Sequence, residues 1–275
     1  MTDVPVAAYL RRIGMDPQTG PPTLDLLAAL QLAHLTTVPF ENLAVFHHRG
    51  PRTGLDWSLP KVVDQRRGGW CFELNGAFGA LLQALGFAAD HVACRVWEGN
   101  PGNPTPADWG PEFDHLGVVV RLDGERWFVD VGFGDCCLVP LPLASGEYDA
   151  VPRPARMDAL PRGIHILHEL LPPDGDDGRM AAAWTPQLHI DPTPRQLDEF
   201  DGRSRFLQTD PSSTWHQKPF ATRALDGTGS RVTLRRGLLR HRSGTGPFVD
   251  GRVEEGAPQD ALLGEWFGLA DSFSR

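Results

Sequence analysis

The sequence predicts an α+β protein in which helices come first and antiparallel strands follow. Apolar residues recur at helical spacing through the first third of the 275-residue chain, for example at Leu24, Leu27 and Leu30. From about Asp90 the pattern changes to short runs rich in β-branched residues, separated by turn dipeptides. Because helices and strands are segregated instead of alternating, a parallel βαβ fold is not expected.

Four helices are expected in the first third, each with a start signal. Hydroxyl and carboxylate side chains accept hydrogen bonds from the first turn of a helix, proline is tolerated in that turn, and glycine favours a helix end. On these signals the helices begin after Thr2 or Asp3, after Thr23, at Ser58 before Pro60, and at about Cys71; Gly14 ends the first, and the fourth runs to Leu85 before Gly86.

The remaining segments are expected to be mostly hairpins. Predicted strands are HVACRVW, HLGVVVRL and ERWFVDVGF, then GIHILHELL and MAAAWTPQL on either side of the turn PPDGDDG. The segment DPTPRQLDEF is expected to open a connecting helix. The strands SRVTLRR and GLLRHR and a final helix in APQDALLGEWFG complete the chain.

Composition narrows the function. The net charge of −9 and the pI near 5.5 argue against nucleic acid or an anionic membrane as the main partner. No apolar run approaches the length of a membrane helix and no signal peptide is visible, so a cytoplasmic location is expected. Free thiols and no metal are expected, since no C-x-x-C pair occurs among Cys71, Cys94, Cys136 and Cys137.

The segment from Asp114 to Gly134 carries a predicted His–Asp pair. Asp123-Gly124 is a favoured two-residue hairpin loop, and pairing outward from it sets Asp130 opposite Gly117 and His115 opposite Gly132. Side chains two apart share a face of a sheet, so His115 and Asp130 become diagonal neighbours. The two glycines are expected to leave that face open. A satisfied buried histidine and a strand-end carboxylate are the plainer interpretations of the two residues taken singly.

Cys71 is the candidate nucleophile for this pair. It stands in the first turn of its helix, where unpaired N–H groups and the helix dipole favour an anion. Gly68 and Gly69 precede it, and we expect them to bend the backbone and leave room for an acyl group. The plainer interpretation of a cysteine is a small buried hydrophobe, which suits Cys94 and, less clearly, Cys136 and Cys137.

Taken together, these residues resemble the arylamine N-acetyltransferase family. The resemblance lies in RGGWCFELN around Cys71, HLGVVV from His115 and VDVGFG from Val129, with support from VPFENL and the opening YLRRIG. It covers the first 145 residues well and the last third only in outline, through FLQTDPSS.

The resemblance implies a three-part fold with a cysteine-protease-like Cys-His-Asp core. Residues 1–88 would form a helical bundle carrying the nucleophile, residues 89–190 an antiparallel β-barrel-like domain carrying the histidine and aspartate, and residues 191–275 a linker helix and an α/β lid.

The resemblance also implies the chemistry. The donor would be acetyl-CoA as co-substrate, and the acceptor an aromatic amine, hydrazine or N-hydroxyarylamine. Cys71 would be the nucleophile, His115 the base and Asp130 the residue that orients it. The implied acceptor-pocket residues are Phe40, Val96, Phe133 and Phe206, and the CoA-facing loop is Gly132, Phe133 and Gly134; Glu41 and Arg67 match an acid–base pair that ties the first segment to the active-site loop.

Three departures from the family pattern bear on the acceptor. Asp114 replaces a small hydroxyl residue and is a second carboxylate beside the histidine. Asp135, Cys136 and Cys137 replace a small neutral stretch and are expected to narrow or polarise the pocket. The long segment EGNPGNPTPADWGPEFD is expected to be a surface loop near the pocket mouth.

Three other functions fit part of the sequence. An amide synthase joining an arylamine to a larger acyl chain would use the same three residues. A thiol hydrolase of the papain or transglutaminase type has Cys, His and Asp in the same order, but VDVGFG and VPFENL do not support it. A silent binding module would have no reason to keep all three residues.

Overall fold

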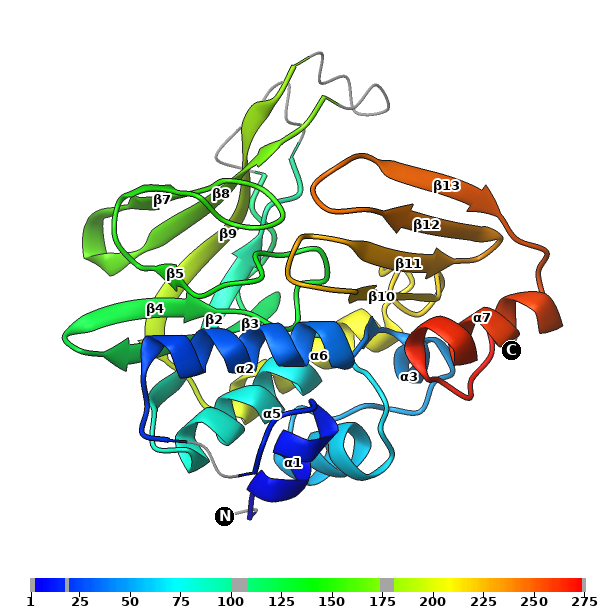
Figure 1. Ribbon diagram of the computed structural model, residues 1–275, viewed down its shortest axis with the longest axis horizontal. Helices are drawn as coiled ribbons and strands as arrows, with labels where there is room; N and C mark the ends of the chain where they lie inside the picture. The colour runs from blue at the N-terminus through cyan, green and yellow to red at the C-terminus, as the bar shows by residue number, and fades with distance from the viewer. Residues whose placement is uncertain (1–2, 18–19, 100–107, 174–180, 274–275) are drawn as a thin grey trace.

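The computed structural model describes residues 3–17, 20–99, 108–173 and 181–273. The fold is α+β, as predicted: helices form one side of the molecule, and two antiparallel sheets lie side by side above them (Figure 1). Among the described residues, no helix combines the length and the apolar character needed to cross a lipid bilayer.

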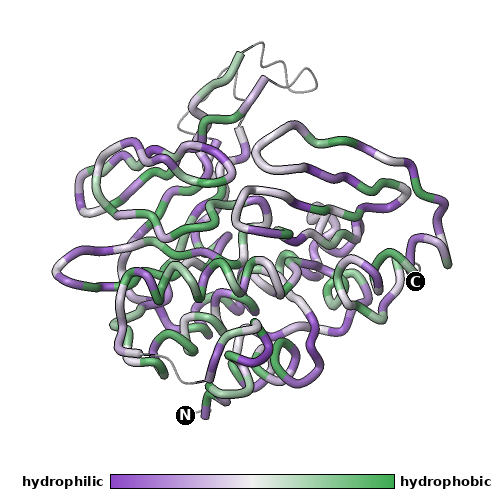
Figure 2. Tube along the Cα trace, in the orientation of Figure 1, coloured by the Kyte–Doolittle hydropathy of each residue, from purple (hydrophilic) through white to green (hydrophobic). Residues whose placement is uncertain are grey.

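The second N-terminal helix forms where capping and periodicity predict. Thr23 Oγ1 accepts a hydrogen bond from the Leu26 N–H at 3.2 Å and so caps α2. Most of α2 is hydrophobic, with a few hydrophilic positions along it (Figure 2), and Leu27, Leu30 and Leu35 are among its buried residues. The helical elements are α1 (Val6–Arg12), α2 (Leu24–Thr37), α3 (Leu43–Phe46), α4 (Leu55–Leu59), a π-helical turn at Pro60–Asp64 and α5 (Cys71–Ala84).

The larger sheet has eight strands in the order β5-β4-β3-β2-β9-β8-β7-β6 and curls into a barrel-like shape. Every pairing in it is antiparallel, and α5 packs against β2 and β3. The strands are β2 (Ala88–Val96), β3 (His115–Leu122), β4 (Glu125–Val129), β5 (Leu141–Pro142), β6 (Gly146–Tyr148), β7 (Ala155–Ala159), β8 (His165–Leu171) and β9 (Ala183–Pro194).

The second sheet combines one strand from the first third of the chain with four strands from the last third. Strand β1 (Phe40–Glu41) lies between helices in sequence but pairs with β10 (Phe220–Ala224). The order continues through β11 (Arg231–Arg235), β12 (Leu238–Arg242) and β13 (Phe248–Arg252). The helix α7 (Ala257–Phe267) packs on β10 and β11. The short turn at Pro161–Gly163 links β7 to β8 within the larger sheet, and the turn at Leu197–Phe200 and the helix α6 (Asp201–Thr209) connect the two sheets.

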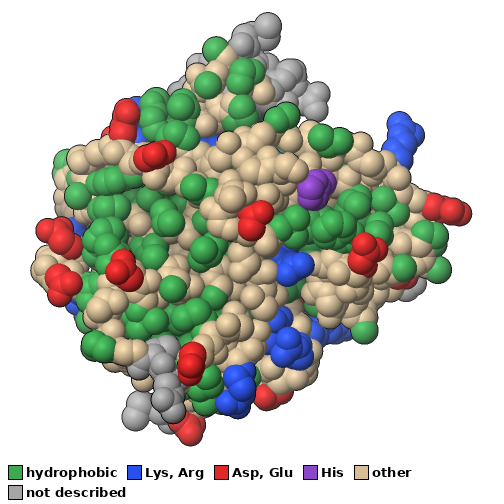
Figure 3. All heavy atoms as spheres, in the orientation of Figure 1, with side chains coloured by type: hydrophobic (Ala, Val, Ile, Leu, Met, Phe, Trp, Pro, Cys, Tyr) green, Lys and Arg blue, Asp and Glu red, His purple; other side chains and the backbone are tan. Residues whose placement is uncertain are grey.

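The described residues form three hydrophobic clusters, of which one lies in the barrel-like sheet and one between the second sheet and α7. The third cluster includes α1, α2, α5, the inner faces of β2 to β4, and Phe200 and Leu207 near and within α6. On the face shown in Figure 3, broad hydrophobic areas lie over the barrel-like sheet, and basic side chains gather lower in the view. The three-part division at residues 88 and 190 therefore stays a prediction about boundaries within one packed molecule.

Three expected helix starts are wrong. The first helix, α1, begins at Val6 after Pro5 and has no side-chain cap, instead of beginning directly after Thr2 or Asp3. Ser58 does not cap a helix: α4 already begins at Leu55, and the Ser58 hydroxyl donates back to the Gly54 carbonyl at 3.4 Å from inside the helix. The segment 191–200 does not begin as a helix either, since β9 continues to Pro194. The helical turn starts at Leu197, where Glu199 accepts a hydrogen bond from the Gln196 N–H at 2.7 Å.

Two expected loops lie mostly outside the residues that the structure describes. Residues 174–180, which include most of the PPDGDDG turn, and residues 100–107 of the long segment before His115 are not described. The described flanks of the long segment approach each other, because Trp97 and Trp109 form an isolated antiparallel bridge.

Candidate active site

Cys71 is the first residue of α5, as the sequence predicts, and its side chain is buried. The start of the helix is fixed by Glu73, whose carboxylate accepts a hydrogen bond from the Trp70 N–H at 3.1 Å. Glu73 is itself held by the Lys61 ammonium group at 2.8 Å and by the Trp57 indole N–H at 2.6 Å. A buried, fully partnered carboxylate thus anchors the turn that carries the thiol.

The two glycines before Cys71 serve a purpose that differs from the predicted one. A β-carbon on Gly68 would lie 2.1 Å from the Pro39 carbonyl oxygen, and one on Gly69 would lie 2.6 Å from a Glu73 carboxylate oxygen. Protein atoms therefore fill the space expected for an acyl group. The glycines let the strand at Phe40 and the Glu73 anchor approach the backbone closely.

His115 and Asp130 meet as the hairpin register predicts. His115 Nε2 donates to Asp130 Oδ2 at 2.7 Å, and both side chains are buried. The hairpin turns at Asp123 and Gly124, which both have positive φ, and Leu122 pairs with Glu125. The ladder ends one pair before Asp130, at Val118 and Val129, so the carboxylate reaches the ring from just beyond the strand.

The expected open face beside this pair is filled. A β-carbon on Gly117 would lie 2.6 Å from the Phe128 ring, and one on Gly132 would lie 2.8 Å from the Cys71 Cα. The missing side chain at Gly132 is therefore what allows the start of α5 to approach the histidine. The pairing of the two hairpin strands does not predict this close approach, because the helix packed on the sheet is not part of the hairpin.

Asn75 is a site residue that the sequence analysis missed. Its Nδ2 donates to Asp130 Oδ1 at 2.8 Å and to the Leu116 carbonyl at 2.6 Å. Its Oδ1 accepts from the Val131 N–H at 2.8 Å. The sequence spacing could have identified it, because Asn75 lies four residues after Cys71 and so on the same face of α5. The side chain fixes the Asp130 oxygen that His115 does not use.

The surroundings of His115 favour the imidazolium form, in which both ring nitrogens are protonated. Burial alone lowers its pKa, but the charge of Asp130, the hydrogen bond to Asp130 and a hydrogen bond with Cys71 together raise it to about 10. Since Nε2 is bonded to Asp130, Nδ1 is the ring nitrogen left for the thiol.

The other cysteines have a different environment. All four cysteines are free thiols. Burial raises the pKa values of Cys94, Cys136 and Cys137 well above the usual range, and nearby carboxylates add to the effect. These three thiols stay protonated and fit the predicted role of small buried hydrophobes.

The predicted pocket residues do not all share one environment. The Phe133 ring stands edge-on to the His115 ring, with centroids 5.2 Å apart. Phe40 is buried, and a β-carbon on Gly134 would lie 3.3 Å from its ring. Val96 is the last residue of β2 and is half-buried. Phe206 lies on α6, is 40% exposed and stacks on Arg203 with 4.7 Å from the guanidinium carbon to the ring centroid.

Both acidic departures from the family pattern are neutralised by arginines. Asp114, next to His115, pairs with Arg203 of α6 at 2.7 Å. Asp135 is met by three guanidinium groups, from Arg153, Arg231 and Arg242, at 2.9, 3.0 and 2.7 Å. Burial acts to raise the pKa of Asp135, but these arginines outweigh it and hold the pKa well below its usual range.

The predicted Glu41–Arg67 pair is loose. Their closest atoms are 4.0 Å apart, whereas Arg67 lies 2.5 Å from Asp271 near the C-terminus. Glu41 instead accepts from the Leu43 N–H and lies 3.5 Å from the Lys61 ammonium group. The first segment is therefore tied to the active-site loop through Lys61, Glu41 and Glu73 more than through Arg67.

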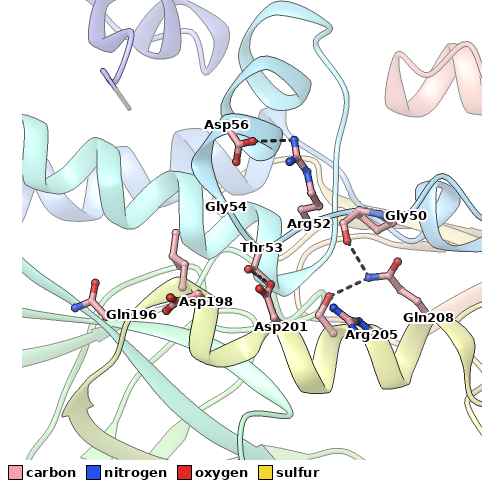
Figure 4. A pocket seen from close by; sticks show the side chains of 13 residues that line it. Gly50, Arg52, Thr53, Gly54, Asp56, Gln196, Asp198, Asp201, Arg205 and Gln208 are labelled. Carbon is pink, nitrogen blue, oxygen red and sulfur yellow. Dashed lines mark hydrogen bonds and ion pairs between the residues drawn. The ribbon is translucent and has the colours of Figure 1, made fainter. Parts of the chain in front are cut away.

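A large surface hollow lies apart from these residues. It has a volume of about 720 Å³ between the loop at Gly50–Gly54 and the start of α6, and it contains none of Cys71, His115 and Asp130 (Figure 4). Some of its polar groups bond to one another, as in the Thr53–Asp201 hydrogen bond of 2.6 Å. Among the described residues, no group of three or more His, Cys, Asp or Glu side chains is arranged to hold a metal ion.

Comparisons with known proteins show which family this chain is similar to. A family model described as N-acetyltransferase matches residues 23–271. An arylamine N-acetyltransferase of Mycolicibacterium smegmatis is 34% identical over 255 residues, which is 87% of this chain and 83% of that protein. The solved arylamine N-acetyltransferase of Salmonella typhimurium is 27% identical with a TM-score of 0.84, covering 100% of this chain and 94% of that one. The Mycobacterium marinum enzyme solved in complex with CoA is 28% identical with a TM-score of 0.82, covering 96% and 93%.

The fold and these relatives place the chain in the acyltransferase class of enzymes. The chain belongs to the arylamine N-acetyltransferase family.

Proposed function

We propose that the protein transfers an acetyl group from acetyl-CoA to an arylamine, arylhydrazine or N-hydroxyarylamine through an acetyl-Cys71 intermediate. The observation that carries this proposal is geometric: buried Cys71 begins α5 beside His115, and His115 Nε2 donates to Asp130 Oδ2 at 2.7 Å. Acetyl-CoA as donor is supported by the relative solved with CoA, and the acceptor class by the family.

In the first half-reaction the Cys71 thiolate attacks the thioester carbonyl carbon. A bond from Sγ to carbon forms, the bond from carbon to the CoA sulfur breaks, and the imidazolium of His115 gives its proton to the leaving CoA thiolate. His115 is then neutral. Asp130 keeps Nε2 in place during this change, because its own Oδ1 is fixed by Asn75 at 2.8 Å and the Gly132 N–H at 2.8 Å.

In the second half-reaction the acceptor nitrogen attacks the acetyl-Cys71 carbonyl. Neutral His115 takes the proton that the nitrogen loses, the bond from carbon to Sγ breaks, and the thiolate and imidazolium are restored. An aromatic amine suits this step because its lone pair is free at neutral pH. Phe133, whose ring lies against His115, supplies an apolar surface for an aromatic acceptor.

Two-substrate kinetics test the proposal. Initial rates with acetyl-CoA and an aniline should give parallel double-reciprocal lines, and CoA should be released from acetyl-CoA before any amine is added. The variant Cys71→Ser should release none. Intersecting lines, or release of CoA only after the amine is added, would contradict a covalent intermediate.

A further inference from the structure

An ion pair joins α6 to the residue directly before His115. Two nitrogen atoms of Arg203, Nε and Nη2, lie 2.8 and 2.7 Å from Asp114 Oδ1. Both side chains are largely shielded from solvent, since 16% of Arg203 and 8% of Asp114 is exposed. Charge-assisted hydrogen bonds in such a place hold their partners more firmly than a pair on the open surface does. The pair therefore fixes α6 against the start of β3.

Asp114 is also packed against the end of β2. A β-carbon on Gly110 would lie 2.9 Å from Asp114 Oδ2 and 3.2 Å from the Val96 carbonyl oxygen. The Gly110 N–H donates to the same Val96 carbonyl at 2.8 Å, and Arg95 Nε donates to the Gly110 carbonyl at 2.6 Å. Asp114 thus rests on a backbone that is held at Val96, one of the predicted acceptor-pocket residues.

Arg203 contacts a second predicted pocket residue on its own helix. Phe206 lies three positions further along α6, so the two side chains are neighbours on the helix surface. The guanidinium carbon of Arg203 lies 4.7 Å from the centroid of the Phe206 ring, which is 40% exposed. Val96 and Phe206 therefore stand at opposite ends of the Asp114–Arg203 pair, one on the sheet and one on the helix.

The residue before Asp114 is held in an unusual conformation by the same part of the chain. Phe113 has a φ of +63°, which a bulky side chain adopts only where its surroundings hold it. Its ring meets the Phe200 ring with centroids 5.2 Å apart, and the Arg195 guanidinium lies over it at 5.3 Å. Residues before and within α6 thus grip both residues that lead into His115, so the spacing between α6 and the sheet is rigid.

We propose that Arg203 is a specificity-determining residue for the acceptor: its ion pair with Asp114 fixes the space between Val96 and Phe206, so that narrow aromatic acceptors react in preference to wide ones. The inference rests on the proposed function, which supplies acetyl-Cys71 and an aromatic amine. A wide acceptor enters only if α6 moves away from the sheet, and this movement breaks a largely desolvated ion pair. A single ring fits without that cost.

The test measures the second half-reaction alone. Protein acetylated on Cys71 and freed of CoA is mixed with aniline, 2-naphthylamine or hydrazine, and the rate constant of discharge is measured for each. Hydrazine is too small to span the pocket and serves as the internal reference. For Arg203→Gln we expect the ratio of the rate constants for 2-naphthylamine and aniline to rise by about threefold to tenfold. Arg205→Gln, on the same helix but in the hollow at Gly50–Gly54, is the matched control and should keep the wild-type ratio.

Two further variants separate the ion pair from a general effect on folding. Asp114→Asn should raise the ratio as Arg203→Gln does, and the double variant should raise it no further, because both changes break the same pair. Arg203→Lys keeps the positive charge and should stay closer to the wild type.

The outcomes distinguish this inference from the proposed function. An unchanged ratio in Arg203→Gln and Asp114→Asn, or an equal fall in the rate constants of all three acceptors, would overturn the inference and leave the proposed function intact. Failure of acetyl-CoA to acetylate the wild-type protein would overturn the proposed function itself, and this inference with it.

Discussion

The backbone of Gly132 lies so close to Cys71 that a β-carbon at Gly132 would be 2.8 Å from the Cys71 Cα. This approach brings the start of α5 onto the loop after β4, where the same Gly132 contributes its N–H to Asp130 at 2.8 Å. One residue thus sets the distance between the helix that carries the thiol and the loop that carries the carboxylate.

Replacing Gly132 by alanine should force α5 and this loop apart. We expect a loss of about 1–3 kcal/mol in the free energy of unfolding, as for overpacked cores, and a larger loss of acylation rate, since the thiol moves away from the imidazole. Gly264→Ala is the control, because a β-carbon there meets nothing within 4 Å and lies in helix α7. Urea denaturation and single-turnover acylation measure both effects; a fully active Gly132→Ala would contradict the close approach.

Replacing Asn75 should shift the Asp130 carboxylate while Cys71, His115 and Asp130 themselves stay unchanged in sequence. Asn75→Ala deletes three buried hydrogen bonds, each worth about 0.5–1.5 kcal/mol, so we expect about 2–4 kcal/mol of destabilisation and reduced acylation. Gln83→Ala, on the same helix, loses one bond to the Ala89 carbonyl and is the control. If Asn75→Ala lost no more stability than Gln83→Ala, Asn75 would not be the support of Asp130 described here.

Because of the His115–Asp130 pair, the free energy of unfolding should fall as the pH rises into the alkaline range. The pKa of His115 is raised to about 10 in the folded protein, from an ordinary value near 6.5, so the folded state holds the proton more tightly. The resulting stabilisation is complete below about pH 6.5 and is lost as the pH rises toward 10.

Asp130→Asn removes the partner that raises this pKa. We expect the wild-type advantage in unfolding free energy over Asp130→Asn to shrink as the pH rises from 6.5 to 10. Both proteins should carry Cys71→Ser, so that the thiol does not titrate. Urea midpoints at several pH values give the answer, and an advantage that stays constant or grows with pH would show that His115 is not held as an imidazolium.

For His34 the pH dependence has the opposite sign: the free energy of unfolding should fall as the pH becomes acidic. Burial and the nearby Arg12 lower its pKa to about 3, and its Nε2 is hydrogen-bonded to the Tyr9 hydroxyl at 3.1 Å. The unfolded chain binds this proton near pH 6.5, so stability falls as the pH drops from 6.5 toward 3, by up to about 1.4 kcal/mol per pH unit from this group. His34→Gln, measured by urea unfolding from pH 7 to pH 4, should show a shallower acid slope than the wild type. Equal slopes would mean that His34 is protonated without cost.

The sequence was informative wherever a local rule decides the structure. Thr23 caps α2, Asp123-Gly124 turns the hairpin, and pairing from that turn brings His115 to Asp130. The rules failed where distant segments meet. The close contacts at Gly68, Gly117 and Gly132 and the three arginines around Asp135 depend on tertiary packing, which spacing along the chain does not contain. Ser58 failed for a local reason, since a serine inside a helix can bond backward to a carbonyl as readily as it can cap.

The central claim is that Cys71 carries the acetyl group. The most direct measurement is the intact mass of the protein after incubation with acetyl-CoA alone, followed by peptide mapping. We predict one acetyl group per chain, located on Cys71, absent in Cys71→Ser and in His115→Ala, and discharged when an aniline or hydrazide is added. Absence of the adduct in the wild-type protein, or an adduct on Cys94, Cys136 or Cys137 in place of Cys71, would contradict it.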